Sequence, residues 1–320
     1  MEPAASLPTL PATPFARVQA LREVAVPWSR QRCGPGVNRS VAMNEIRSVL
    51  LHQDASEASV RRVHLAHRIA AAHGALLEVL YAVTPALLQY PMATSADSQL
   101  AAMLALSDAE TRERAKAAFE REVTAAGFND VLWSEGNDDP VSVFKVHAFA
   151  SDLLVLAQIE PDNRLLSQVP VDFVPTVLIE TGKPAVVLPE DFKAERIGST
   201  VLIAWKPSAS SARAVSAALP FLRMASRVHV ATWEDDGHLD RNNPLPIERY
   251  LQRHGITATV HQGGRPTRDT GELLLALAAD VRADLLVMGC YGHSRTREWI
   301  LGGVTRSVLR LAKLPLLMAH

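Results

Sequence analysis

Short apolar runs alternate along this chain with longer segments in which apolar residues recur every three or four positions. The short runs are typical of buried strands, and the longer segments are typical of helices with one apolar face. Apolar strands joined by helices favour a parallel sheet that is covered on both faces. In chain order, the first part is predicted to contain strand 49–52, helix 56–73, strand 76–82, helix 98–126, strand 131–134, helix 141–150, strand 152–157, helix 174–181 and strand 185–188.

The same pattern occurs a second time along the chain. Residues 49–63 align without a gap with residues 201–215, and the strand that begins at Asp152 aligns with one that begins at Asp284. The strands of the second copy are predicted at 201–205, 228–233, 258–261, 285–289 and 316–318. The repeat predicts an α/β protein with two tandem open parallel five-stranded sheets, in domains 44–192 and 196–320.

Composition excludes several classes of protein. The length of 320 residues suits two domains. A formal net charge of −1, with acids and bases interspersed, argues against a nucleic-acid binder. No apolar run reaches the roughly 18 residues that a membrane helix needs. Two cysteines, Cys33 and Cys290, cannot form a disulfide framework, so we expect a cytoplasmic protein.

Residues 1–43 differ from the rest of the chain. They are rich in Pro, Ala and Arg, show no hydrophobic period and contain no apolar signal-peptide core. We therefore expect a disordered N-terminal extension. Met43, which stands directly before the first strand, is a second candidate for the start of translation.

One glycine-rich segment of the second copy carries chemistry. The strand 285–289 ends at Gly289, a second glycine follows at Gly292, and Gly302 comes after a spacer of nine residues. Glycines let the backbone turn sharply and let a ligand approach closely. The helix predicted to follow would present free N–H groups, which favour an anion. The segment therefore predicts a phosphate cradle.

This spacing, Gly289-x2-Gly292-x9-Gly302, resembles the nucleotide-binding signature of the universal stress proteins, and the closing strand 314–320 resembles the last strand of that family. The resemblance covers residues 44 to 320. It implies an adenine nucleotide alpha hydrolase-like fold with strand order 3-2-1-4-5, and it implies binding of ATP or AMP, with or without Mg²⁺. The residue after Gly302 is usually Ser or Thr in this family but is Gly303 here, and Thr305 could supply the hydroxyl instead.

The implied strand order also places the site. Open α/β sheets bind ligands at the carboxyl ends of the strands where the order reverses, here the first and fourth strands of the second copy. The resemblance further implies that backbone N–H groups of the glycine loop line the phosphates. The candidate nucleotide-binding residues are Ala204, Trp205, Lys206, Met288, Gly289, Gly292, His293, Gly302, Gly303, Val304 and Thr305.

Several of these residues have two readings. Lys206 stands where the family usually has an Asp, retained as Asp54 in the first copy, and it either pairs with phosphate or is a solvated lysine. Trp205 either stacks on a base or caps the sheet. Cys290 is either a reactive thiol near a helix N-terminus or a small buried residue. His293 either contacts phosphate or is an ordinary loop residue.

The first copy has lost the glycine loop. Residues 157–160 read Ala-Gln-Ile-Glu, and Glu160 and Asp162 place negative charge where a phosphate would lie. We expect this copy to be structural or regulatory and not to bind ATP in the same way. No metal site and no catalytic residue are identified.

The function predicted from these features is that of a universal stress response protein whose second domain binds an adenine nucleotide as a sensor or switch. The alternative is an interaction protein that acts through protein partners or a small apolar ligand. Slow ATP hydrolysis or phosphotransfer ranks third. The two domains are expected to pair through their last strands, 185–188 and 316–318, and a homodimer is a further option.

Overall fold

The computed structural model describes residues 46–90, 98–158, 168–194, 196–233, 246–264, 269–291 and 303–320. The elements of the first half are β1 (Ser48–Gln53), α1 (Glu57–His73), β2 (Leu76–Tyr81), α2 (Ala86–Gln89), α4 (Ser98–Ala126), β3 (Val131–Glu135), α5 (Pro140–Ala148), β4 (Leu153–Ala157), α6 (Phe173–Thr181) and β5 (Ala185–Leu188). Those of the second half are β6 (Thr200–Ala204), α7 (Ala209–Met224), β7 (Arg227–Trp233), α8 (Pro246–Arg253), β8 (Ala258–Gly263), α9 (Thr270–Asp280), β9 (Leu285–Gly289), α10 (Gly303–Leu311) and β10 (Leu316–Ala319).

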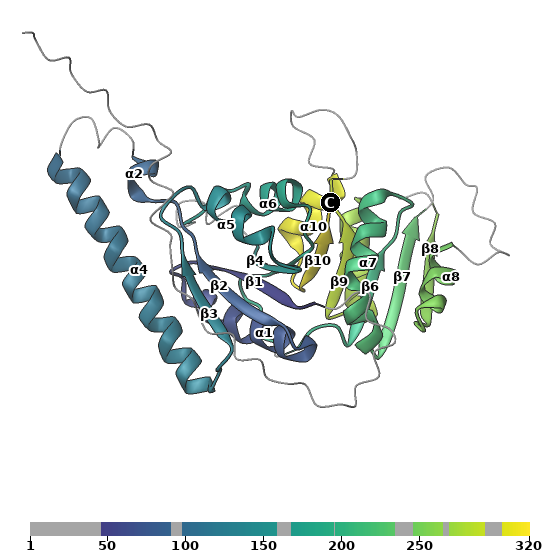
Figure 1. Cartoon of the computed structure of the whole chain (residues 1–320). Coiled ribbons are helices and arrows are strands. Elements are labelled where there is room, and N and C mark those ends of the chain that lie inside the picture. The colour runs from purple at the N-terminus through teal and green to yellow at the C-terminus, as the bar shows by residue number, and fades with distance from the viewer. Residues whose placement is uncertain are drawn as a thin grey trace, which may run out of the picture. The chain divides into compact units, whose positions relative to one another are not determined.

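The strands form one ten-stranded sheet in the order β3-β2-β1-β4-β5-β10-β9-β6-β7-β8 (Figure 1). Within each half the neighbouring strands are parallel. Numbered by their order in the chain, the five strands of each half therefore lie across the sheet in the order 3-2-1-4-5. This confirms the predicted α/β fold. Every predicted strand is present, and its ends lie within two residues of the predicted ones. The short helix α2 was not predicted, because four residues are too few to show a helical period.

The two halves join through their last strands, as predicted. β5 and β10 pair antiparallel, with Val186 opposite Leu317. Every residue of both strands is buried. Left unpaired, each strand would be an apolar sheet edge, which soluble proteins avoid. The pairing therefore buries two apolar edges at once and makes the two sheets continuous.

Helices cover both faces of the sheet. The core on one face includes side chains of α1, α4, α7 and α8, and the core on the other face includes side chains of α5, α6, α9 and α10. Central strands such as β4 and β9 are apolar and buried on both faces, whereas the edge strands β3 and β8 are only partly buried. This difference follows from parallel strands that lie between two helical layers.

The repeat also shows in a pair of matched aspartates before β4 and β9. The Asp152 carboxylate accepts hydrogen bonds from the backbone N–H groups of Arg47 and Ser48. The Asp284 carboxylate does the same for Gly198, Ser199 and Thr200. Each aspartate thus fixes the start of the first strand of its half beside the fourth.

Met43–His320 forms one compact unit. The predicted limits of the domains, 44–192 and 196–320, fall between β5 and β6 and stay predictions. The predicted extension 1–43 lies outside the described residues. Among the described helices, none combines the length and the apolar character needed to cross a membrane.

Candidate functional site

The carboxyl ends of β6 and β9 lie side by side in the second half. Ala204 is paired with Met288, and Trp205 donates its backbone N–H to the carbonyl of Ala231 at 2.8 Å. Gly289 ends β9 opposite Ala319 of β10. The fold therefore brings together the predicted site residues from both strand ends, because parallel neighbouring strands end at the same edge of a sheet.

Gly289 is required by helix packing. A Cβ atom at this position would lie 2.4 Å from the backbone nitrogen of Ser211 and 2.5 Å from the carbonyl carbon of Ser210. Both atoms belong to the backbone of the first turn of α7, which cannot move without shifting the helix. The missing side chain thus lets the N-terminus of α7 pack directly against the end of β9.

Three serines that the sequence analysis did not single out lie at this helix start. Ser208 is the N-cap, and its Oγ accepts the backbone N–H of Ser211 at 3.2 Å. The Oγ atoms of Ser210 and Ser211 lie 3.3 Å and 3.1 Å from that of Ser208. The positive end of the helix dipole and several hydroxyl donors therefore converge beside the end of β9. A serine-rich turn directly after a strand is a helix-start signature that could have revealed them.

The glycine loop itself is only partly described. Gly292, His293 and Gly302 lie outside the described residues. Helix α10 begins at Gly303, which is exposed, and Val304 is half-buried. The side chain of Thr305 is buried, with the residue 6% exposed. The hydroxyl of Thr305 is therefore turned into the fold, and the backbone at Gly303 is the more accessible part of this helix start.

Cys290 behaves as a buried residue. It is 1% exposed, and its backbone N–H donates to the carbonyl of Ala319 at 2.9 Å. Burial raises the pKa of its thiol to about 12. Of the two readings of Cys290, the structure supports the small buried residue, because a thiol with this pKa stays protonated and unreactive at neutral pH. The next residue, Tyr291, has a left-handed backbone with a φ of 53°.

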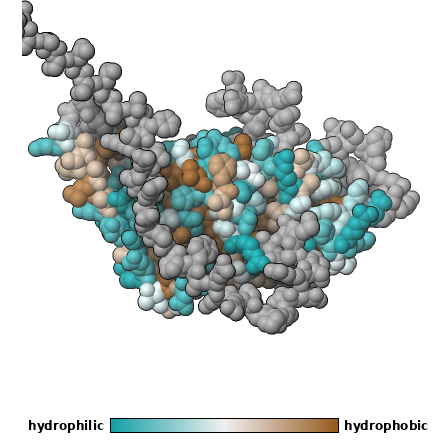
Figure 2. Space-filling view, in the orientation of Figure 1, coloured by the Kyte–Doolittle hydropathy of each residue, from teal (hydrophilic) through white to brown (hydrophobic). Residues whose placement is uncertain are grey.

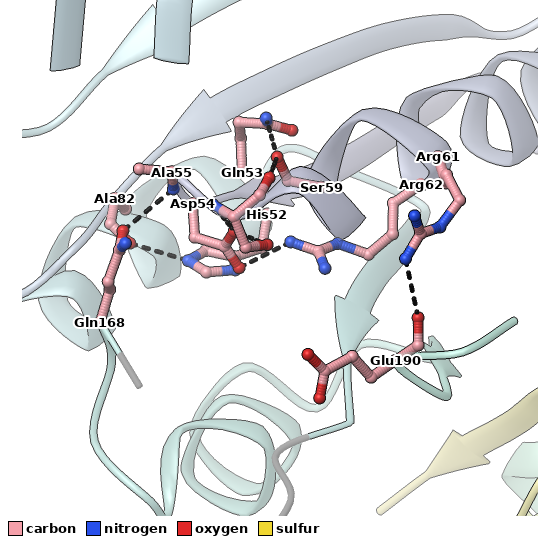
Figure 3. Close-up of polar contacts among 11 residues, drawn as sticks. His52, Gln53, Asp54, Ala55, Ser59, Arg61, Arg62, Ala82, Gln168 and Glu190 are labelled. Atoms are coloured by element: carbon pink, nitrogen blue, oxygen red, sulfur yellow. Dashed lines mark hydrogen bonds and ion pairs between the residues drawn. The ribbon is translucent and has the colours of Figure 1, made fainter. Parts of the chain in front are cut away.

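At the matching strand end of the first half, the end of β1, two side chains form an ion pair (Figure 3). Arg62 of α1 reaches back to Asp54, and their Nη2 and Oδ2 atoms lie 2.6 Å apart. Their side chains are 7% and 17% exposed. The second carboxylate oxygen of Asp54 accepts the backbone N–H of Ser56 at 2.8 Å. Burial by itself raises the pKa of Asp54, but Arg62, His52 and Ser56 outweigh it and lower the pKa.

The second half replaces both members of this pair. In the gapless alignment Asp54 corresponds to Lys206 and Arg62 to Ala214, whereas the N-cap Ser56 corresponds to Ser208. The strand end that carries the glycine loop therefore has a lysine on its surface where the other strand end has a neutralised carboxylate. The two halves share a backbone but differ in the residues that stand at this strand end.

His52, next to this pair, is held in its neutral form. Its Nε2 donates to the carbonyl of Ala82 at 2.7 Å, and its ring contacts Phe144 and Phe173. Burial lowers the pKa of His52 to about 4, although Asp54 and the Ala82 carbonyl oppose the shift. At mildly acidic pH, His52 therefore binds a proton in the unfolded chain but not in the folded one.

We expect this histidine to make the fold sensitive to acid. The contribution of neutral His52 to the free energy of unfolding is fully present above pH 6.5. It is lost as the pH falls toward 4, because only the unfolded state binds the proton in that window. His52→Gln can keep the hydrogen bond to Ala82 without titrating. Relative to this variant, the wild type should lose about 2 kcal/mol more stability between pH 7 and pH 4.5. Urea unfolding at both pH values measures this, and parallel losses in the two proteins would disprove it.

Among the described residues, no group of three or more His, Cys, Asp or Glu is placed to hold a metal ion. A model of the universal stress protein family matches residues 199–320. A search of curated protein sequences found no significant match.

Solved structures resemble a larger part of the chain. A universal stress protein from Archaeoglobus fulgidus DSM 4304 has a TM-score of 0.65 and 17% identity, over 86% of this chain and 96% of that one. A functionally unknown protein from Pseudomonas aeruginosa PAO1 has a TM-score of 0.53 and 18% identity, over 86% and 92%. A universal stress protein in complex with cAMP has a TM-score of only 0.29 and 23% identity, over 46% and 100%. At these identities the likeness concerns the fold, and the ligand of the last protein says nothing about this chain.

Proposed function

We propose that the second half of this chain, in which a model of the universal stress protein family matches residues 199–320, binds an adenine nucleotide, ATP or AMP, at the ends of β6 and β9. Binding would make the chain a nucleotide sensor or switch in a stress response. The first half would serve as its structural or regulatory partner. We also propose a cytoplasmic location, from the cysteine usage described above.

The change of residues at this strand end between the two halves carries this proposal. In the first half Arg62 neutralises Asp54 at the carboxyl end of β1, where the strand order reverses. In the second half Lys206 and Ala214 stand at these positions, next to the N-terminus of α7 with its cluster of serines. A lysine, a helix N-terminus and hydroxyl donors together favour a phosphate group. This strand end lies in the same half as the glycine-rich segment of the sequence.

The residues present fit a nucleotide in this place. Phosphates supply negative charge, which Lys206 and the exposed backbone at Gly303 can meet with N–H donors. Trp205 is half-buried at the end of β6 and packs against the core on the α7 face of the sheet, so a base would meet the exposed part of its ring. Gly289 keeps α7 close to the sheet, so that its serines stay beside the end of β9. These groups bind and orient, and none of them is assigned a catalytic step.

The proposal predicts that two glycines of the loop control affinity. Gly292→Val and Gly302→Val should each weaken ATP and AMP binding by at least about tenfold, roughly 1.4 kcal/mol, because a branched side chain would intrude on the ligand or require a costly backbone conformation. Calorimetric titration of the full chain and of each variant measures the affinities.

The first half provides the matched control. Glu160→Val changes the position that corresponds to Gly292 and should leave nucleotide affinity unchanged, because we assign no ligand to that half. Wild-type affinity in both glycine variants would refute the site. No measurable binding by the wild type would leave the interaction-protein alternative.

A further inference from the structure

Helix α4 packs into the core of the sheet only through its later part, and its earlier part contacts α2, whose Ala86 donates its backbone N–H to Asp108. It has 29 residues, from Ser98 to Ala126, and its buried residues are Ala115 and Phe119. Both lie in the later part of the helix, where Phe119 packs on the ring of Trp133 in β3. The beginning of the helix has no buried side chain and lies beside α2, away from the sheet (Figure 1). We call residues 98–107 the α4 overhang.

The α4 overhang exposes large apolar side chains. Met103 is 68% exposed, Leu106 61% and Leu100 44%. Spacings of three residues place these side chains along one stripe of the helix surface. Leu88 and Tyr90, in and after α2, add two further apolar groups with exposures of 54% and 59%. Hydrophobic surface is visible at this end of α4 in Figure 2.

This surface lacks the charges that usually keep an exposed helix in water. Residues 98–107 contain no Asp, Glu, Lys or Arg, whereas the next residues include Asp108, Glu110 and Arg112. An amphipathic surface helix normally carries charged residues on its outer face. A clustered, exposed and uncharged apolar face is typical of an interaction site.

We propose that the α4 overhang is an interface between two copies of this chain, with the two overhangs packed antiparallel about a two-fold axis at Met103. In this arrangement Met103 faces Met103 of the second copy, and Leu100 faces Leu106. The inference is independent of nucleotide binding.

The charge pattern selects both the occupant and the orientation. Two antiparallel overhangs centred on Met103 bring uncharged residues into contact, and Glu110, the first charge near the stripe, falls beyond the start of the other helix at Ser98. A parallel pairing would set Glu110, which lies near the stripe, against Glu110 of the second copy, and like charges that face each other are unfavourable; Asp108 is turned away to α2, where it accepts the backbone N–H of Ala86. The antiparallel orientation of two copies therefore keeps like charges out of the contact.

The exposed area suffices for a weak dimer. The five large side chains and the alanines between them can bury on the order of 500 Å² per copy, or about 1,000 Å² for the pair, which is near the lower limit of specific interfaces. Such interfaces are typically transient, so we expect a dissociation constant on the order of 10 µM.

Sedimentation velocity of the full chain tests the interface. The wild type should change from monomer to dimer between about 1 and 200 µM, since this range brackets the expected dissociation constant. Met103→Glu should weaken the dimer by at least about thirtyfold, because it sets two carboxylates against each other across the axis. Met224→Glu is the control, since Met224 is 61% exposed at the end of α7 in the other half and should have no effect.

Mixing variants tests the antiparallel geometry. Met103→Glu and Met103→Lys should each be monomeric alone but should form a mixed dimer within about tenfold of wild-type affinity, because opposite charges then meet at the axis. Leu100→Glu mixed with Leu106→Lys should do the same.

Four outcomes would overturn the proposal. They are a wild type that stays monomeric at about 200 µM, a Met103→Glu variant that dimerises like the wild type, charge-matched mixtures that stay monomeric, and a chain that dimerises only when it starts at Met43. The last result would show that the residues before Met43 cover this face instead.

Discussion

Gly289→Ala is expected to destabilise the chain by about 3 kcal/mol, a large effect for the addition of one methyl group. The new Cβ would lie 2.4 Å from the backbone nitrogen of Ser211. Since that atom belongs to the first turn of α7, relief requires a shift of the whole helix start. The shift would also disturb the serine cluster, so nucleotide affinity should fall together with stability.

Urea unfolding followed by circular dichroism measures this loss. Gly303→Ala is the matched control, because no atom of the described residues lies within 4 Å of a Cβ at that position. Alanine at the start of α10 should leave stability within about 0.5 kcal/mol or raise it slightly, since alanine is the better helix former. Equal stability of the two variants would show that α7 can retreat from β9 without cost.

Arg62→Met should also cost about 3 kcal/mol. It leaves the carboxylate of Asp54 buried without its cation, and a buried charge that loses its partner is strongly destabilising. Arg61→Met is the control on the same helix. Arg61 is exposed and reaches the carbonyl of Glu190 at 3.5 Å, so its loss should change stability by less than about 0.5 kcal/mol.

The double variant Asp54→Asn, Arg62→Met isolates the pair. It should recover most of the stability that Arg62→Met loses, because no unpaired charge remains. Full additivity of the two single effects would show that Asp54 and Arg62 are energetically independent despite their contact.

The fold could be predicted from the sequence because its signals are local and repeated. Fully apolar strands such as 153–157 and 285–289 can lie only in a sheet covered on both faces, and the second copy gave an independent reading of each element. The pairing of β5 with β10 followed from their apolar character, since each would otherwise be an exposed edge.

The site could be predicted only in outline. The strand ends that meet at Ala204 and Met288 followed from the strand order. The packing of Gly289 on α7 did not, because it depends on how closely a helix approaches a strand that lies about eighty residues later in the sequence. The Asp54–Arg62 pair joins a strand end to the second turn of a helix, and the alignment showed its two positions without showing that they touch.

The α4 overhang shows a different limit. Helix 98–126 was predicted with the bounds that it has in the structure. Its apolar residues near the start look like those of any buried helix face, because a sequence pattern shows which residues share a face but not whether another element covers it. The exposure of Met103 and Leu106 became evident only when α4 was seen to be buried at Ala115 and Phe119 alone.

The number of nucleotides bound per chain tests the central claim most directly. Calorimetric titration of the full chain with ATP should give one binding site per chain, which Gly292→Val weakens and Glu160→Val leaves intact. A value of zero would contradict nucleotide binding by the second half. A value of two would contradict the conclusion that the Asp54–Arg62 pair and the missing glycine loop leave the first half without a nucleotide site.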